Sequence, residues 1–201
     1  MAGRNHWWGK QCLKGFYIWL SRFGGAHRQP RSFSAIITSL IGIKLRGVTK
    51  IATTRLMPLH VGKGRNISTA IADIIDYVEN PQKTDFGKFI YGYECDTRLA
   101  DAEFLLSKRQ YANLTGRNQG ADDVIAYHLR QAFKPGEVTP EEANQIGREL
   151  ALKLTKGNHA FVVCTHVDKH HVHNHIIINS TTLDCQKKFR NFWGSTWAIR
   201  R

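Results

Sequence analysis

Apolar residues near position 70 recur at the spacing of one helix face. The members of this stripe are Ile71, Ile74, Ile75 and Val78, at positions i, i+3, i+4 and i+7. Asn80-Pro81 follows directly, and a proline cannot continue a helix. The pattern therefore predicts an amphipathic helix that ends at about residue 80.

Three further segments are interpreted as helices. Residues 101–116, DAEFLLSKRQYANLTG, read as a helix stopped by Gly116, and residues 121–133, ADDVIAYHLRQAF, read as another. Thr139-Pro140-Glu141-Glu142 is a capping box with proline at the first helical position. It opens a helix whose buried side is predicted to carry Ala143, Ile146, Leu150 and Leu154.

Four segments have the character of strands. They are residues 53–61, 88–95, 159–167 and 172–179. Pro58 lacks an N–H to donate, so the first of these strands is expected at an edge or a bulge. The predicted order is β-α-β-α-α-α-β-β, which favours an α+β fold with a mainly antiparallel sheet flanked by helices.

The charge of the chain points to a polyanionic partner, although it is unevenly spread. The 201 residues carry a formal net charge of +13. Residues 1–50 hold nine lysines and arginines and no acid, whereas residues 51–201 hold twenty basic and sixteen acidic residues. Most of the excess therefore lies in the first fifty residues, which also hold three of the five tryptophans.

The first fifty residues allow several interpretations. They could be a basic, aromatic arm for nucleic acid or a membrane surface, a segment similar to a transit peptide, or an appended extension. We expect residues 1–50 to be an extension outside the domain. The four cysteines, Cys12, Cys95, Cys164 and Cys185, form no CxxC pair, which argues against a cysteine zinc site and fits a reducing compartment. No apolar run is long enough to predict membrane insertion.

The stretch THVDKHHVHNHIIIN, residues 165–179, holds five of the ten histidines. Because alternate residues of a strand share a face, His171, His173 and His175 would point the same way. A turn over residues 167–170 would fold His166 back beside His173 or His175. Three imidazoles would then meet, and three histidines leave coordination positions open for a substrate oxygen. Asp168 is placed to accept the second ring N–H of one ligand.

A histidine-rich tract can also be a loose metal scavenger, and a single histidine is usually a surface or core residue. This tract, however, alternates, adjoins a turn and continues into an apolar strand. Clustered imidazoles would repel one another if protonated and would leave buried nitrogens unpaired if neutral. A shared cation resolves both problems, so we expect a specific metal site.

The segment HVDKHHVHNHIIIN resembles the metal motif of relaxases, the mobilisation nucleases of conjugative plasmids and integrative elements, within the HUH endonucleases. The wider resemblance, to relaxases of Gram-positive integrative conjugative elements, covers about residues 52–201. It implies a central sheet of about five strands flanked by helices. It also implies that His166, His173 and His175 bind a divalent metal, with Asp168 supporting the first of them. His171 would be an auxiliary ligand or proton carrier, and Asn179 would hold the strand or the DNA backbone.

Relaxases cut one DNA strand with a tyrosine, which leaves a 5′-phosphotyrosyl link and a free 3′-OH. Tyr77, at the edge of the predicted apolar stripe and within DYVENPQKT, resembles the nucleophile of the family. The alternatives are that Tyr77 only packs its ring, or that Tyr111, beside Lys108 and Arg109, is the nucleophile. Tyr91 and Tyr93 would share a strand face, as core residues or as a platform for bases.

The resemblance further implies single-stranded DNA at a transfer origin as substrate, accessory relaxosome proteins and a coupling protein as partners, and the bacterial cytoplasm as location. Candidate DNA contacts are Lys63, Arg65, Lys108, Arg109, Asn179, Lys187 and Lys188. The expected cofactor is Mn²⁺ or Mg²⁺, and imidazole ligands also suit Zn²⁺, Ni²⁺ or Co²⁺.

Two other functions stay open at this point. One is a replication initiator of the same HUH class, and the other is an inactive module that binds DNA or metal without cutting. The chain stops soon after the motif, so we expect residues 51–201 to be a catalytic domain that is incomplete at its C-terminus.

Overall fold

The computed structural model describes residues 52–62, 64–117 and 120–191, except for the side chain of Ala121. The described elements follow the chain in this order: β1 (Ala52–His60), α3 (Ile67–Glu79), β2 (Ile90–Tyr93), the short 3₁₀ turn η1 (Thr97–Leu99), α4 (Ala100–Thr115), the 3₁₀ turn η2 (Gly120–Asp122), β3 (Val124–Phe133), α5 (Pro140–Thr155), β4 (Phe161–His166) and β5 (His173–Asn179). The expected α+β class is confirmed. The predicted extension, residues 1–50, lies outside the described residues.

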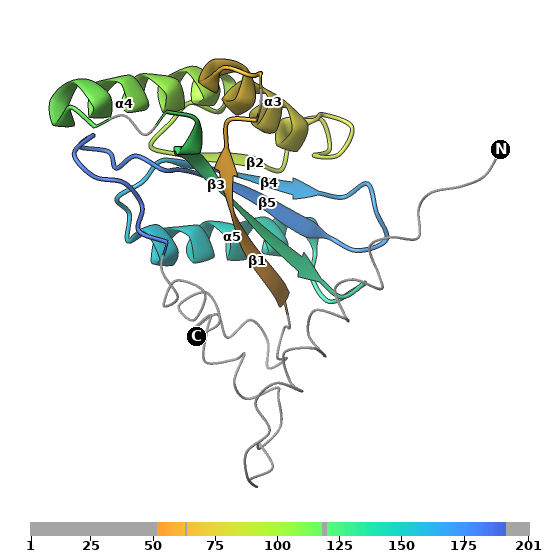
Figure 1. Cartoon of the computed structure of the whole chain (residues 1–201). Coiled ribbons are helices and arrows are strands. Elements are labelled where there is room, and N and C mark those ends of the chain that lie inside the picture. The colour runs from red at the N-terminus through yellow and green to blue at the C-terminus, as the bar shows by residue number, and fades with distance from the viewer. Residues whose placement is uncertain (1–51, 63, 118–119, 192–201) are drawn as a thin grey trace, which may run out of the picture. The chain divides into compact units, whose positions relative to one another are not determined.

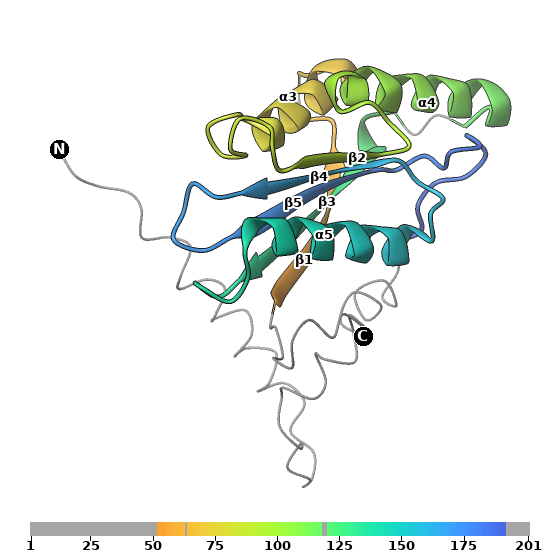
Figure 2. The same cartoon turned by 180° about the vertical axis from the view of Figure 1, so that it is seen from behind.

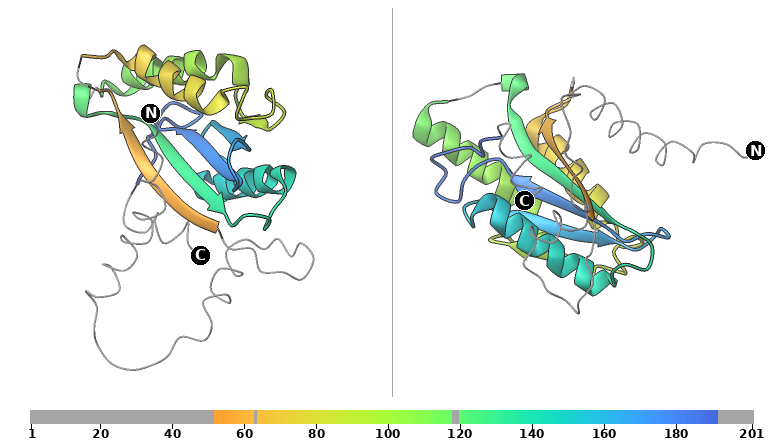
Figure 3. Two further views of the ribbon diagram at one scale, coloured as in Figure 1. Left: turned by 90° about the vertical axis from the view of Figure 1, so that its right-hand side faces the viewer. Right: turned by 90° about the horizontal axis from the view of Figure 1, so that it is seen from below.

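The strands form one five-stranded antiparallel sheet in the order β1-β3-β5-β4-β2 (Figure 1). Helices α3 and α4 cover one face of this sheet and α5 covers the other, as the view from behind in Figure 2 also shows. The side view in Figure 3 separates these three layers. The histidine strand β5 is therefore central, with β3 on one side and β4 on the other.

Two apolar layers explain why the helices pack on these faces. Ile71, Ile75 and Val78 of α3 are buried against Val162 and Ile177 of the sheet. On the other face, Leu150 and Ala151 of α5 belong to a second cluster with Phe161, Val163 and Ile176. The alternation of side chains along β4 and β5 thus feeds both clusters, because successive residues point to opposite faces. No helix in the described ranges is long and apolar enough to span a bilayer.

The predicted end of the first helix and the predicted beginning of the last helix are confirmed. Asn66 caps α3 by accepting a hydrogen bond from the Thr69 N–H at 2.7 Å, and Asn80 follows its last residue. The capping box is present at α5: Thr139 Oγ1 accepts from the Glu142 N–H, and the Glu142 carboxylate accepts from the Thr139 N–H. Pro58 lies on the edge strand β1, where its missing donor costs least.

The helix predicted over residues 121–133 is wrong, because this segment contains strand β3. Nearly every residue of β3 from Ile125 to Phe133 is at least half buried, since the strand lies between β1 and β5 and has both faces covered. A strand buried on both faces shows no alternation of apolar and polar residues, so periodicity could not separate it from a helix. The order of main elements is therefore β-α-β-α-β-α-β-β.

A polar network behind the metal motif fixes the register of β5. Asn174 points to the α5 face, where its Nδ2 donates to Gln131 Oε1 at 2.9 Å and to the Ala143 carbonyl at 2.6 Å. Its Oδ1 accepts from Thr165 Oγ1 at 2.7 Å. Gly147 of α5 leaves room for this group, since a Cβ there would lie 2.7 Å from Asn174 Nδ2. A one-residue slip of β5 would break these bonds and turn the histidines to the wrong face.

Candidate metal centre and neighbouring tyrosine

The structure brings His166, His173 and His175 together at one end of β4 and β5. His166 lies directly opposite His173 in the antiparallel ladder, and His175 follows two residues later on the same face. The ring centroids are 5.2 Å apart for His166 and His173, 4.3 Å for His166 and His175, and 5.2 Å for His173 and His175. One nitrogen from each ring lies within 4.8 Å of the others. Small ring rotations would let all three bind one ion.

Each ring has an outer partner at one of its two nitrogens. His166 Nε2 lies 2.8 Å from the Val78 carbonyl, and His173 Nδ1 lies 3.3 Å from the His171 carbonyl. His175 Nδ1 lies 2.8 Å from His128 Nε2. A carbonyl can only accept, so the nitrogen that faces it carries the proton and the other nitrogen keeps its lone pair. The outer partners of His166 and His173 thus select the tautomers that can ligate a metal, whereas the partner of His175 is an imidazole that can donate or accept.

Burial favours the neutral imidazoles that a metal requires. Desolvation is the main cause of a lowered pKa at His166, His173 and His175, and it brings the pKa of His173 to about 4. Mutual repulsion within the cluster adds to the effect, as His166 lowers the pKa of both other rings. All three side chains are therefore neutral at pH 7, with a lone pair available.

The donor set fits a divalent cation. Three imidazole nitrogens are borderline ligands that suit Zn²⁺, Ni²⁺, Co²⁺ or Mn²⁺, and three protein ligands leave positions for substrate oxygens. These three histidines are the only such group of three or more ligating side chains in the part of the chain that the structure describes.

Tyr77 lies beside this group. It belongs to the last turn of α3, next to Val78, whose carbonyl holds His166. The Tyr77 ring centroid lies 5.7 Å from that of His175 and 6.3 Å from that of His166, in edge-on contact with both. Its side chain is about half exposed, at 49%. The Lys83 ammonium lies 4.3 Å from the ring centroid, on the turn after α3. A substrate could thus reach the phenol from solvent.

The remaining motif residues lie at the rim of the cluster. The His171 ring centroid is 5.2 Å from that of His173, and its carbonyl faces His173 Nδ1. Asp168 is exposed in the β4–β5 turn, and its carboxylate raises the pKa of His166 and His173 through its charge, against the larger lowering by burial. Among the described residues, no hydrogen bond joins Asp168 to a histidine ring, and the outer positions belong to Val78, His171 and His128.

The other tyrosines that the sequence offered lie elsewhere. Tyr111 is buried at 8% exposure on α4, with the Lys188 ammonium 5.2 Å from its ring centroid. Tyr91 and Tyr93 are half-buried on β2 and pack against the α5-side cluster. Among the tyrosines of the described residues, only Tyr77 has ring contacts with members of this cluster, namely His166 and His175.

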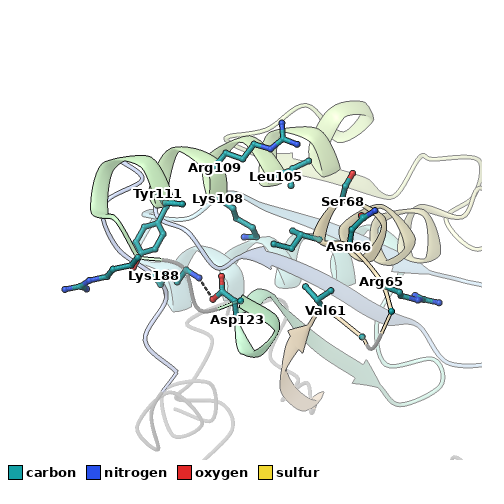
Figure 4. A pocket seen from close by; sticks show the side chains of 16 residues that line it. Val61, Arg65, Asn66, Ser68, Leu105, Lys108, Arg109, Tyr111, Asp123 and Lys188 are labelled. Carbon is teal, nitrogen blue, oxygen red and sulfur yellow. Dashed lines mark hydrogen bonds and ion pairs between the residues drawn. The ribbon is translucent and has the colours of Figure 1, made fainter.

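Several of the residues predicted to contact DNA line a cavity of about 790 Å³ near the beginning of α3 (Figure 4). Arg65, Lys108, Arg109 and Lys188 line this cavity. Figure 4 shows Lys188 paired with Asp123 and Arg109 pointing away from the sheet. Lys187 is exposed on the segment after β5. Lys63 lies outside the described residues.

Lys108 and Asn179 are buried and bind each other. The Lys108 ammonium donates to Asn179 Oδ1 at 2.8 Å and to Ser180 Oγ at 3.0 Å, and Asn179 Nδ2 donates to Ser107 Oγ at 2.7 Å. Burial and the nearby Lys188 charge lower the pKa of Lys108 to about 7. The expectation that Asn179 holds the strand agrees with these contacts, which join the end of β5 to α4.

Sequence reasoning missed His128 and Arg130. Both point to the same face as the histidine cluster, since Arg130 lies opposite His175 and His128 opposite Ile177 in the β3–β5 ladder. The segment that holds them was interpreted as a helix, so neither residue was connected with the motif. A lone histidine carries no spacing signal, and only the correct strand assignment with its register could have found it.

Comparison with known proteins agrees with this geometry. The family model for the MobA/VirD2-like relaxase nuclease domain matches residues 77–201. The chain is 34% identical to the group II intron-interrupted relaxase LtrB of Lactococcus lactis over 139 residues. The matched segment covers 59% of this chain and 24% of that protein. Protein rlx of Staphylococcus aureus is 45% identical over 100 residues, covering 50% of this chain and 29% of that protein.

The chain thus spans less than a third of the length of these relatives. The family match covers more than half of the chain and includes both Tyr77 and the three clustered histidines. The chain belongs to the MobA/VirD2-like relaxase family and carries its nuclease domain.

Proposed function

We propose that this chain is a metal-dependent, site- and strand-specific DNA nicking and strand-transfer enzyme that acts at a transfer origin and initiates conjugative DNA transfer. Family membership supports the relaxase class. The observation that carries the finer proposal is the position of Tyr77, half exposed and 5.7 Å by ring centroid from His175. A nucleophile and a cation site are thereby side by side on an open part of the protein.

Tyr77 is the proposed nucleophile. Its phenol oxygen forms a bond to phosphorus as the bond from phosphorus to the 3′ oxygen breaks, which leaves a 5′-phosphotyrosyl link and a free 3′-OH. The proton lost by the phenol balances the proton gained by the departing 3′ oxygen. Because one phosphodiester is exchanged for another, the reaction can run backwards and rejoin a strand.

His166, His173 and His175 would hold the cation. A divalent ion held by these rings would supply positive charge that stabilises the scissile phosphate in the transition state. We assign His171 as a proton carrier at the rim, because its ring contacts His173 and stays partly open to solvent. Asp168 keeps the site electrostatically favourable for a cation through its charge.

The Lys83 ammonium places a positive charge beside Tyr77. It lies 4.3 Å from the centre of the ring, a distance at which a cation attracts an electron-rich aromatic face. A hydrogen bond from the Val167 N–H to the Lys83 carbonyl, at 2.8 Å, joins this turn to the end of β4. The turn, the tyrosine and the histidines are thus supported as one unit.

Single-stranded DNA is the proposed substrate, and its backbone would follow the cations of the α3–α4 side. Arg65, Arg109 and Lys187 are exposed and would contact phosphates directly. Lys63, two positions before Arg65 in the sequence, is proposed as a further contact. Lys108 and Lys188 would act from the wall of the cavity in Figure 4, and Asn179 would act through its hydrogen bond to Lys108; their bonds to neighbours limit direct contact with DNA.

The proposed metal is Mn²⁺ or Mg²⁺ by the resemblance, with Zn²⁺, Ni²⁺ or Co²⁺ as better chemical matches to three imidazoles. We also propose that the enzyme works in the bacterial cytoplasm with accessory relaxosome proteins and a coupling protein.

Covalent trapping tests the proposal. The protein is incubated with single-stranded transfer-origin DNA carrying a 5′ label on one strand and a 3′ label on a matched strand, with Mn²⁺ or with a chelator. We expect an SDS-stable adduct that keeps only the 3′ label, because the 5′ phosphate remains on the protein. A chelator should abolish it.

The outcomes separate the alternatives. Absence of an adduct with every metal tested, together with retained DNA binding, would establish a binding module without nuclease activity. An adduct that forms only with a replication-origin sequence would establish a replication initiator. An adduct that retains the 5′ label would contradict the proposed chemistry.

A further inference from the structure

We infer that His128, on β3 and outside the histidine motif, is a positioning residue that fixes the ring of His175 for metal binding. This inference rests on the proposed metal site. His128 would not contact the cation. It would act through His175, by holding the Nδ1–H of that ring.

The two residues are diagonal neighbours on adjacent strands. His175 lies opposite Arg130, and His128 lies two positions further along β3 on the same face. Diagonal neighbours are within reach of aromatic side chains. His128 Nε2 and His175 Nδ1 are 2.8 Å apart, and the ring centroids are 4.9 Å apart with an angle of 31°. The contact is thus a direct ring-to-ring hydrogen bond, well within normal length.

Proton placement makes this contact compatible with only one tautomer of a ligating His175. When Nε2 of His175 gives its lone pair to a cation, the ring proton must lie on Nδ1. That proton is donated to Nε2 of His128, which is therefore the acceptor and keeps its own proton on Nδ1. His128 is 6% exposed, so water does not compete easily for the bond.

His175 differs from the other two ligands in the kind of partner it has. His166 and His173 face the backbone carbonyls of Val78 and His171, which no side-chain replacement removes. The outer partner of His175 is a side chain. Losing it would free the ring to rotate and would leave a buried N–H without an acceptor, which costs free energy. Among the three ligands, His175 is therefore the one whose orientation depends on another side chain.

The test compares two substitutions of nearly equal shape. His128→Gln keeps an oxygen acceptor at about the position of Nε2, whereas His128→Met keeps the length and removes the strong acceptor. The matched control is His159→Met, because His159 is similarly buried but bonds to the carbonyls of Asn179 and Thr181. Affinity for Mn²⁺ and Co²⁺ is measured by calorimetry on the whole chain, and the Co²⁺ absorption spectrum reports the number of ligands.

We expect His128→Met to weaken metal binding by about 10- to 100-fold, the usual effect of losing an outer partner of a ligand. His128→Gln should recover most of the affinity, and His159→Met should bind as the unaltered chain does. The Co²⁺ spectrum at saturation should show an unchanged coordination number in every variant. Melting of the metal-free proteins shows whether each variant folds, and His128→Leu replaces His128→Met if the latter does not.

Equal metal affinity in His128→Met and the unaltered chain would overturn the inference. A spectrum that loses one nitrogen ligand in both His128 variants would also overturn it, because His128 would then be a ligand. These results differ from a failure of the proposed function. If the variants show the predicted order of metal affinities but the unaltered chain forms no covalent adduct, the role of His128 is supported and the nuclease proposal is contradicted.

Discussion

His166 and His173 lie directly opposite each other on β4 and β5, with ring centroids 5.2 Å apart. This pairing, together with His175, is what brings three imidazoles from two strands together. We predict that His173→Ala loses most of the affinity for Mn²⁺ or Co²⁺, since two imidazoles cannot replace three ligands. Its side chain is only partly buried, so the melting temperature of the metal-free protein should fall little. Unchanged calorimetric titration of the variant would exclude His173 as a ligand.

The metal-free protein should lose stability in mild acid. Burial lowers the pKa of five imidazoles below the ordinary value of 6.5, and it brings the pKa of His128 and His173 to about 4; the other three are those of His159, His166 and His175. Between pH 6.5 and 4 the unfolded chain therefore binds more protons than the folded chain. The stability that these neutral histidines contribute is fully present above pH 6.5, and it is lost as the pH falls through this range.

One partly buried carboxyl group has the opposite effect on how stability depends on pH. Burial, then Asp76, raises the pKa of Glu79 to about 7, so this group favours the folded state as pH falls. Five imidazoles outweigh one carboxyl, and the urea midpoint should be lower at pH 5 than at pH 7.5. His159→Gln should show a shallower dependence, because it lacks one titrating group. An equal midpoint at both pH values would contradict the burial of neutral histidines.

Gly147→Ala should destabilise the protein, although alanine is normally the better helix residue by roughly 1 kcal/mol. Its Cβ would lie 2.7 Å from Asn174 Nδ2 and 3.0 Å from Val163 Cγ1. Asn174 cannot move aside without losing its bonds to Gln131, Ala143 and Thr165. Chemical denaturation measures the effect, and Gly136→Ala is no matched control because Gly136 has a left-handed backbone.

A suitable control for this substitution is an exposed helix position. Glu149→Ala on α5 should be nearly neutral, because Glu149 faces solvent in part and its hydrogen bond to Gln145 is exposed. If the Gly147→Ala variant were as stable as the Glu149→Ala variant, the close approach of α5 to β5 would be contradicted.

Arg109→Gln should weaken binding of single-stranded DNA in a salt-dependent way. If Arg109 contacts one phosphate, its loss lowers the slope of log affinity against log salt by about 1. Fluorescence anisotropy at several salt concentrations measures this slope. Lys153→Gln is the control, because Lys153 is an exposed cation of α5, on the other face of the sheet. A slope equal in both variants would exclude a phosphate contact at Arg109.

The sequence predicted the clustering of the three histidines because the information for it is local. His166, His173 and His175 lie on two consecutive strands joined by a short turn, so periodicity and one hairpin bring the rings together. The helix of Tyr77 was equally accessible, since its stripe of isoleucines is regular and its end is marked by Asn80 and a proline. What periodicity could not give is how far the end of this helix lies from the hairpin.

Strand β3 shows where sequence reasoning fails. Its residues are buried on both faces, and the Tyr127, His128 and Leu129 run has neither the period of a strand nor a breaker that excludes a helix. The error concealed His128, whose relation to His175 depends on pairing across 47 residues. Long-range register of this kind is set by tertiary packing, which no local pattern encodes.

The most direct test of the account is to identify the residue that carries DNA. The covalent adduct formed with single-stranded transfer-origin DNA and Mn²⁺ is digested and its modified peptide mapped by mass spectrometry. The account predicts a nucleotide on Tyr77, and no adduct from Tyr77→Phe even though that variant still binds the metal. A nucleotide on Tyr111 or any other residue, or an undiminished adduct from Tyr77→Phe, would contradict it.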